Sequence, residues 1–179
     1  MATLVGAKGR VVSFEPDPDA RNLLEKNLQL NCVHDCVRVE SIAVSDAVGE
    51  ARFFSRRGDT RSSLRLLSNN PISPEAVESI SVQTTTIDEY LERNNLPAPK
   101  LVKIDIEGAE IHALRGAPNL LASKALVICE LHPFAWSAFG ATFAELQRIV
   151  KSGGRRMRHL DSQKELEGEP HYGCVLLEK

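Results

Sequence analysis

The chain has 179 residues, of which 42% are hydrophobic and 26% are charged, and its formal net charge at pH 7 is -2. These proportions are typical of a folded protein with a real hydrophobic core, so they exclude a mainly disordered chain. The near balance of 22 basic and 24 acidic residues argues against nucleic acid as a partner, because nucleic-acid-binding proteins carry a basic surplus. We predict a single domain over residues 1–179.

The cysteines and the hydropathy of the chain bear on its location. Cys32 and Cys36 have no pair of Cys or His at zinc spacing nearby, while Cys129 and Cys174 lie inside apolar runs, as small core residues do. No apolar run approaches the roughly 18 residues that a membrane span needs. We expect a protein of the reducing cytoplasm without a membrane partner.

The first predicted elements are a strand at residues 10–14 and a helix that continues to about residue 30. Asp17 and Pro18 are a typical N-cap and first residue for that helix. Glu15 stands where the strand ends, and an acid there can accept hydrogen bonds from ribose hydroxyls in a nucleotide-binding unit. A surface acid before a turn explains Glu15 equally well.

Residues 37–44 and 51–54 predict two further strands, and residues 55–79 differ from both. This segment is polar, and long loops in compact domains are usually functional. We expect a substrate-side insertion that covers the acceptor, not a linker between domains. Its expected apolar anchor is a cluster of three leucines, Leu64, Leu66 and Leu67.

Residues 81–85 predict a strand, and Thr86 with Glu89 forms a capping box at the start of the next helix. Residues 100–105 then read as a buried strand, after which Gly108 allows a sharp turn into a helix at 109–115. Asp105 and Glu107 come where this strand should stop. A role of Asp105 as a helix cap alone is the alternative, but it leaves the second acid unexplained.

The last third of the chain contains another apolar strand at 125–130, a helix that begins after Thr142, and a closing pair of strands at 155–160 and 174–177. The arginines at the start of that pair are explained by a solvated strand edge as well as by phosphate binding. The alternation of strands and helices predicts an α/β domain with a mostly parallel sheet. We expect four parallel strands, with residues 100–105 in the interior of the sheet and residues 174–178 reversed. The four are residues 10–14, 37–44, 100–105 and 125–130.

Acids follow three of the predicted strands, and parallel strands bring their carboxyl ends to one edge of a sheet, where ligands bind. The residues in question are Glu15, Asp105 with Glu107, and Glu130 with His132. His132 or an acid with a raised pKa suits the removal of a proton, although a structural histidine is an equal alternative. A magnesium or calcium ion at Asp105, Glu107 and Glu130 is a weaker alternative, because no neutral oxygen donor accompanies the acids.

Several motifs together resemble one known family. They are Val12-Ser-Phe-Glu-Pro-Asp-Pro18, Leu28-Gln-Leu-Asn31, Ile42-Ala-Val-Ser-Asp46, Thr85-Thr-Ile-Asp-Glu-Tyr-Leu91, Lys103-Ile-Asp-Ile-Glu-Gly-Ala-Glu110, Leu114-Arg-Gly-Ala117 and Glu130-Leu-His-Pro133. Over residues 5 to 135 the chain is similar to the FkbM family of S-adenosylmethionine-dependent methyltransferases. The resemblance implies a Rossmann-like methyltransferase sheet with a reversed last strand. It also implies methyl transfer, typically to an oxygen of a small metabolite or a sugar.

The resemblance further implies roles for individual residues. Glu15 would hold the adenosine ribose of S-adenosylmethionine, Ala43 and Val44 would lie near the adenine, and Asp105 would lie beside the methionine part and the acceptor. Further candidates on the acceptor side are Glu107, Glu130 and His132.

One part of the family pattern is not found. The glycine-rich turn that holds the methionine end should precede Glu15 by roughly 20 residues, but only 14 residues do so, and Gly6 and Gly9 lie too close. We therefore expect a chain truncated at its N-terminus, without the first strand and its turn. A remnant or interaction domain that no longer binds cofactor is the alternative, and a nicotinamide dehydrogenase, which needs the same loop, is a weaker one. We expect a small-molecule acceptor, and we make no prediction about the oligomeric state.

Overall fold

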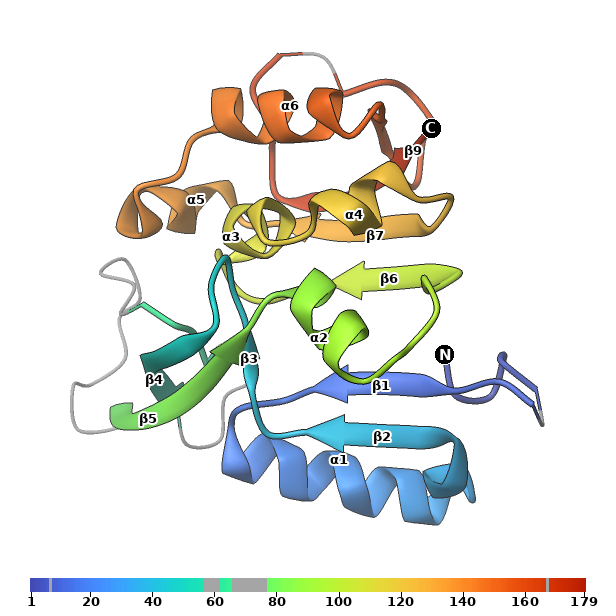
Figure 1. The fold of residues 1–179 in the computed structure, drawn as a ribbon. Helices are drawn as coiled ribbons and strands as arrows, with labels where there is room; N and C mark the ends of the chain where they lie inside the picture. Colours follow the sequence, from blue (N-terminus) through green and yellow to red (C-terminus); the bar gives the residue numbers. More distant parts are fainter. Residues whose placement is uncertain (7, 57–61, 66–76, 167) are drawn as a thin grey trace.

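The computed structural model describes residues 1–6, 8–56, 62–65, 77–166 and 168–179. Its strands form a two-stranded sheet, a three-stranded sheet and a four-stranded sheet, with helices between and around them (Figure 1). The α/β class expected from the alternating pattern is therefore confirmed, whereas the expected single continuous sheet is not found among the described residues.

The two-stranded sheet pairs β1 (Val11–Phe14) in parallel with β2 (Val37–Glu40), and α1 (Pro18–Leu30) and the 3-10 turn η1 (His34–Cys36) connect them. The cap of α1 is the expected one, because the Asp17 carboxylate accepts hydrogen bonds from two main-chain N–H groups of the first turn. The strand expected at 37–44 is divided, since β3 (Ala43–Val44) leaves β2 and joins the three-stranded sheet.

The three-stranded sheet has the order β3-β5-β4. Here β4 (Gly49–Arg56) runs antiparallel to β5 (Val77–Thr85), and β3 runs parallel to β5. Both ends of the expected insertion at 55–79 are thus strand, because the ladder between the two extends to Arg56 and Val77. Leu66 and Leu67 of the expected anchor lie outside the described residues, whereas Leu64 packs against both hydrophobic clusters of the protein.

The four-stranded sheet has the order β6-β7-β9-β8. In it β6 (Leu101–Ile104) is parallel to β7 (Leu126–Leu131), and β9 (Gly173–Glu178) runs antiparallel to both β7 and β8 (Arg156–His159). The reversed last strand is therefore confirmed. The helices that accompany this sheet are α3 (Glu110–Arg115), α4 (Pro118–Ala122), α5 (Pro133–Trp136) with the 3-10 turn η3 (Ser137–Phe139), and α6 (Phe143–Ser152).

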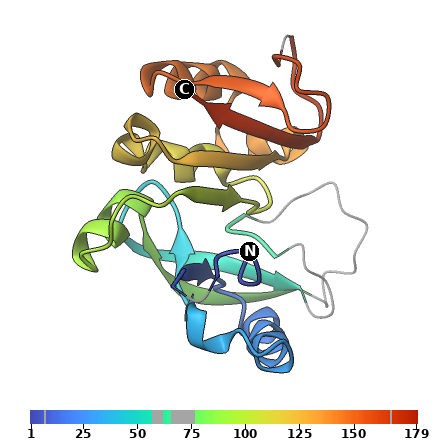
Figure 2. The ribbon, with the colours of Figure 1, turned by 90° about the vertical axis from the view of Figure 1, so that its right-hand side faces the viewer.

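The expectation that residues 100–105 lie inside the sheet was wrong, because β6 is an edge strand. Its inner neighbour is β7, and no described strand pairs with its other edge. The same holds for β1, which pairs only with β2. In Figure 1, β1 and β6 point the same way, and both views place them next to each other (Figures 1 and 2). Two parallel pairs therefore face each other with unpaired edges.

A bridge between the two sides comes from α2 (Ile87–Arg93), which begins at the expected cap Thr86. The Tyr90 ring packs edge-on against Phe14 of β1, and its hydroxyl donates to Glu40 of β2. On the opposite side, the Asp88 carboxylate accepts the N–H of Leu120 in α4 at 3.0 Å. No described helix is both long enough and apolar enough to pass through a membrane.

Most of the large hydrophobic cluster comes from residues beyond 100. Arg155 lies inside this half with only 5% of its surface exposed, and its guanidinium donates to five main-chain carbonyls. These belong to Leu120, Leu121, Ser123, Ala125 and Leu177. A solvated strand edge therefore does not describe Arg155, which ties α4 to the sheet, whereas its neighbour Arg156 is exposed.

Candidate functional site

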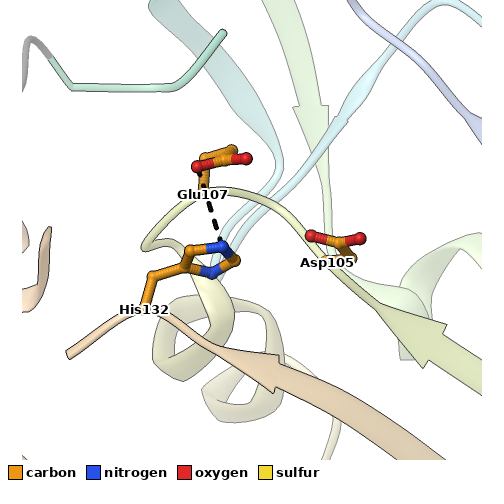
Figure 3. A group of neighbouring side chains, drawn as sticks. All are labelled: Asp105, Glu107 and His132. Atoms are coloured by element: carbon orange, nitrogen blue, oxygen red, sulfur yellow. Dashed lines mark ion pairs between the residues drawn. The ribbon is translucent and has the colours of Figure 1, made fainter. Parts of the chain in front are cut away.

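Three of the predicted site residues meet at the carboxyl ends of β6 and β7. Asp105 and Glu107 follow β6, His132 follows β7, and one ligand atom from each lies within 4.8 Å of the other two (Figure 3). Within this group, His132 Nε2 and Glu107 Oε2 form an ion pair at 3.7 Å. The expectation that parallel strands bring these acids to one edge is confirmed for this group, which we call the Asp105–Glu107–His132 cluster.

The turn that carries Glu107 is held in a backbone conformation that few residues adopt. Glu107 has a φ of 52°, and Gly108 has a φ of 105° with no room for a side chain, because an added Cβ would lie 2.5 Å from Ala135 Cβ. Positive φ in a residue other than glycine costs free energy and concentrates at functional sites. The hydroxyl of Ser63 donates to the Glu107 carbonyl at 2.9 Å, so the described part of the insertion reaches the cluster's side of the molecule.

Glu110 is a component that the sequence reasoning did not single out. Its side chain is fully buried, and its Oε1 lies 2.9 Å from His132 Nδ1 and accepts the Gly108 N–H at 2.8 Å. Its Oε2 accepts the indole N–H of Trp136 at 3.1 Å. A buried carboxylate facing Nδ1 makes that nitrogen the donor, which leaves Nε2 to face the cluster. The available signal was an acid beside the apolar residues Ile111, Ala113 and Leu114 of the helix at 109–115.

His132 is buried, with only 3% of its surface exposed, so its protein environment determines its charge. Burial alone would lower the pKa of His132, but the hydrogen bond to Glu110 and the nearby acids raise it above its usual value. Burial raises the pKa of Glu107, and Asp105, Glu110 and Glu130 raise it further, against the opposing effect of His132. Both groups therefore bind a proton more tightly than they would in water, and groups with shifted pKa values in such a position are candidates for proton transfer.

Asp105 differs from its predicted environment. A buried acid was expected, but 34% of its side-chain surface is exposed, and its Oδ2 lies 2.7 Å from the ammonium of Lys103. The reason is the free edge of β6, which leaves the end of that strand uncovered. Asp105 is also not the cap of α3, since that helix begins after Ala109 without a side-chain cap.

Glu130 does not belong to the cluster. It lies within β7, and its carboxylate accepts the hydroxyl hydrogen of Tyr172. The group that could hold a cation therefore contains His132 in place of Glu130. Glu130 remains close enough to raise the pKa values of Glu107 and Lys103.

The residues expected on the cofactor side lie on other elements. Glu15 follows β1, its Oε1 accepts the Asp17 N–H at 2.9 Å, and burial raises its pKa. Ala43 is 4% exposed and packs in the small hydrophobic cluster of the three-stranded sheet, while Val44 packs on the large one. None of the contacts found between described residues joins Glu15 to the Asp105–Glu107–His132 cluster. The structure thus brings Asp105, Glu107 and His132 together without Glu130, and Glu15 stands apart across the edges of β1 and β6 that no described strand pairs with.

Several known proteins are similar to this chain in sequence. Residues 1–157 match the family model of the methyltransferase FkbM domain. The chain is 30% identical over 131 residues to the hexuronic acid methyltransferase AglP of Haloferax volcanii and 26% identical over 133 residues to the 2-O-methyltransferase NoeI of Sinorhizobium fredii. These alignments cover 73% and 69% of the chain but only 51% and 54% of the relatives, so the chain spans about half their length.

A solved structure gives the same picture of the fold. The methyltransferase FkbM of Methylobacillus flagellatus KT superposes with a TM-score of 0.56 at 16% sequence identity. The match covers 94% of this chain and 36% of the larger one. At this identity the likeness concerns the fold alone.

Proposed function

The chain belongs to the FkbM methyltransferase family, and we propose that it transfers a methyl group from S-adenosylmethionine to a hydroxyl oxygen of a sugar. The observation that carries this proposal is the Asp105–Glu107–His132 cluster at the carboxyl ends of two parallel strands. Ligands of α/β sheets bind at this position. The names of the two relatives, a hexuronic acid methyltransferase and a 2-O-methyltransferase, support a sugar hydroxyl as the acceptor.

The cofactor would lie along the carboxyl ends of β1 and β6. When bound, S-adenosylmethionine would supply a methyl group on a positively charged sulfur. The sulfur–methyl bond would break as the acceptor oxygen bonds to the methyl carbon, with S-adenosylhomocysteine as the leaving group. Glu15 fits the ribose, because its described hydrogen bond uses Oε1 and leaves Oε2 to accept from a hydroxyl. Ala43 and Val44 would lie near the adenine, and Asp105 would lie beside the methionine part.

The residues of the cluster would position the acceptor and take its proton. Methyl transfer is an in-line displacement, so alignment of the acceptor oxygen supplies much of the rate. The acceptor hydroxyl would donate to Nε2 of His132, which Glu110 holds in the required tautomer at 2.9 Å. Glu107 would share that proton, since its carboxylate lies 3.7 Å from the same nitrogen.

We further propose that a strand between β1 and β6 completes the site. No described strand pairs with the facing edges of β1 and β6, and the two strands point the same way in Figure 1. A turn after such a strand would hold the methionine end of the cofactor from the gap between β1 and β6, where no described strand lies. Without it several hydrogen bonds to charged groups are lost, each at about 1.5–3 kcal/mol. Two such losses weaken binding by roughly a hundredfold or more.

Calorimetry with S-adenosylmethionine and a radiolabel transfer assay with simple glycosides test the proposal. We expect weak or undetectable binding by the 179-residue chain alone. We expect binding and transfer in a chain extended upstream by one strand–turn–helix unit of about 30 residues. In that chain, Glu15→Gln should weaken cofactor binding by about tenfold or more, whereas the exposed control Glu25→Gln should not.

The outcomes separate the two functions that the sequence left open. Cofactor binding by the extended chain without transfer to any glycoside would contradict the sugar acceptor. Failure of the extended chain to bind would favour the alternative of a domain of the same fold that no longer binds cofactor. Micromolar binding by the chain without the extension would show that the additional strand is dispensable.

A further inference from the structure

The Asp105–Glu107–His132 cluster has the donor set and spacing of a cation site. Ligand atoms about 2.0–2.2 Å from a shared ion are about 3 Å apart when they are adjacent and about 4.4 Å apart when they are opposite. The 3.7 Å between His132 Nε2 and Glu107 Oε2 lies inside this range, and the upper limit of 4.8 Å for the whole group lies just above it.

The buried histidine is the second observation that points to a metal. Among the described residues, Nε2 of His132 makes no hydrogen bond, and it faces the two carboxylates (Figure 3). Its other nitrogen faces the fully buried carboxylate of Glu110 at 2.9 Å. A carboxylate behind the far nitrogen is the usual partner of a metal-binding histidine, because it fixes the tautomer and makes the binding nitrogen more basic.

The charges around the cluster favour a cation as well. The charges of four carboxyl groups affect the pKa of Glu107 or of His132. These groups are Asp105, Glu107, Glu110 and Glu130, and Asp105 is also bonded to the ammonium of Lys103. Lys103 occupies only Oδ2 of Asp105, so Oδ1 can still serve as a ligand. Like charges this close repel one another unless a positive charge lies between them.

We propose that Asp105, Glu107 and His132 bind one divalent cation, with Glu110 orienting the histidine from behind. One imidazole and two carboxylates suit Mn²⁺ better than Mg²⁺, which prefers oxygen alone, and better than soft ions, which prefer thiolates. Three protein ligands leave positions open, as in catalytic sites.

The proposed ion would serve the methyl transfer proposed above, and only this role rests on that function. Two neighbouring oxygens of a sugar, such as a hydroxyl beside a carboxylate or another hydroxyl, would fill the open positions. The ion would lower the pKa of the bound hydroxyl, whose proton then passes to solvent on the exposed side of Asp105. His132 would act as a ligand in the loaded protein and as a proton acceptor without the ion.

Titration of the 179-residue chain with MnCl₂ alone, by calorimetry and by the broadening of the His132 NMR signals, tests the site without any methyl transfer. We expect one ion per chain. Glu107→Gln should abolish saturable binding. Glu110→Gln should weaken it by about 10–100-fold although this residue touches no ion. Lys103→Gln should strengthen it, because it removes the competing ammonium.

Two control variants should leave Mn²⁺ binding largely unchanged. Trp136→Phe removes the hydrogen bond to Oε2 of Glu110 but leaves the contact between Oε1 and His132, so Mn²⁺ affinity should change little. Glu130→Gln removes a nearby acid that is not a ligand and should preserve the stoichiometry. If Glu110→Gln fails to fold, the Glu107 and Lys103 variants still decide the question.

The proposal is overturned if the chain shows no saturable Mn²⁺ binding, or if binding is equal in the parent, Glu107→Gln and Lys103→Gln. Equal binding would indicate only loose attraction to surface acids. Metal binding without methyl transfer would leave the site standing and remove its proposed catalytic purpose, so failures of the two proposals are distinguishable.

Discussion

The two parallel strand pairs of this protein, β6–β7 and β1–β2, are built alike and packed very differently. In β7, Val127, Cys129 and Leu131 are fully buried, and α3, α4 and α6 contribute further buried residues to the same cluster. In β1, by contrast, every residue is only half-buried, and Leu28 is the one buried residue that α1 contributes. Parallel sheets are normally covered on both faces.

This difference has a functional meaning, because the two pairs carry different parts of the site. His132 of the cluster follows the well-packed strand β7, where a buried network fixes it, whereas Asp105 and Glu107 follow the edge strand β6. Glu15 stands on the loosely packed pair, next to the free edge of β1. Stable elements fix groups precisely, whereas marginal elements become ordered when something binds them. We expect the acceptor side to be preformed and the cofactor side to be completed by the proposed strand.

We expect the largest effect on stability from a substitution of Arg155, which lies buried beside the well-packed strand pair β6–β7. Arg155→Met removes the donor from five main-chain carbonyls, which lie in α4, in the segment between α4 and β7, and in β9. We expect the free energy of unfolding to fall by roughly 3–5 kcal/mol, since buried acceptors would lose their partners. Arg156→Met, at the exposed neighbouring position, should change it by less than about 0.5 kcal/mol. Equal effects in urea denaturation would contradict the role of Arg155.

A matched pair of leucines compares the two halves directly. Leu114→Ala, at a site with no exposed surface, should lower the free energy of unfolding by about 2–5 kcal/mol. Leu28→Ala, at 9% exposure in the sparsely packed half, should lower it by less than about 2 kcal/mol. Both are read from denaturant curves of the same chain. A larger loss at Leu28 would reverse the comparison.

A smaller and pH-dependent effect is expected at Asp17, which joins the loosely packed half to β4. Burial would raise the pKa of Asp17, but hydrogen bonds from Ser55, Ser62 and two main-chain N–H groups lower it below 3.8. Its contribution is therefore present above about pH 4 and is lost as the pH falls through the lowered pKa. Asp17→Ala should cost about 1–2 kcal/mol at pH 7 and much less near pH 2.

Asp19→Ala is the control for this prediction, because Asp19 lies exposed in the same first turn. It should show neither the loss at neutral pH nor the change with pH. A loss in Asp17→Ala that stays constant down to pH 2 would show that the charge of Asp17 contributes nothing.

The sequence predicted what local chemistry determines. Asp17, Thr86 and Thr142 cap the helices that they were expected to cap, and the apolar run of 125–130 became β7 nearly residue for residue. It also predicted that Asp105, Glu107 and His132 would meet, because the carboxyl ends of parallel strands meet at one edge.

The features that the sequence did not reveal depend on contacts distant along the chain. The partnership of Glu110 with His132 spans 22 residues and depends on how α3 packs against β7, which no local pattern encodes. Arg155 read as a surface residue because its carbonyl partners carry no signature in the sequence. Similarly, the exposure of Asp105 follows from the absence of a described strand beside β6.

Hydrogen exchange of the 179-residue chain, read by mass spectrometry, tests the central claim most directly. The claim is that β1, which carries Glu15, is far less stable than β7, which carries His132. We predict that the amides of residues 11–14 exchange at least about a hundredfold faster than those of residues 126–131, a difference in opening free energy of about 2.8 kcal/mol. Equal protection of the two segments would contradict it, because β1 would then need no further strand to be held in place.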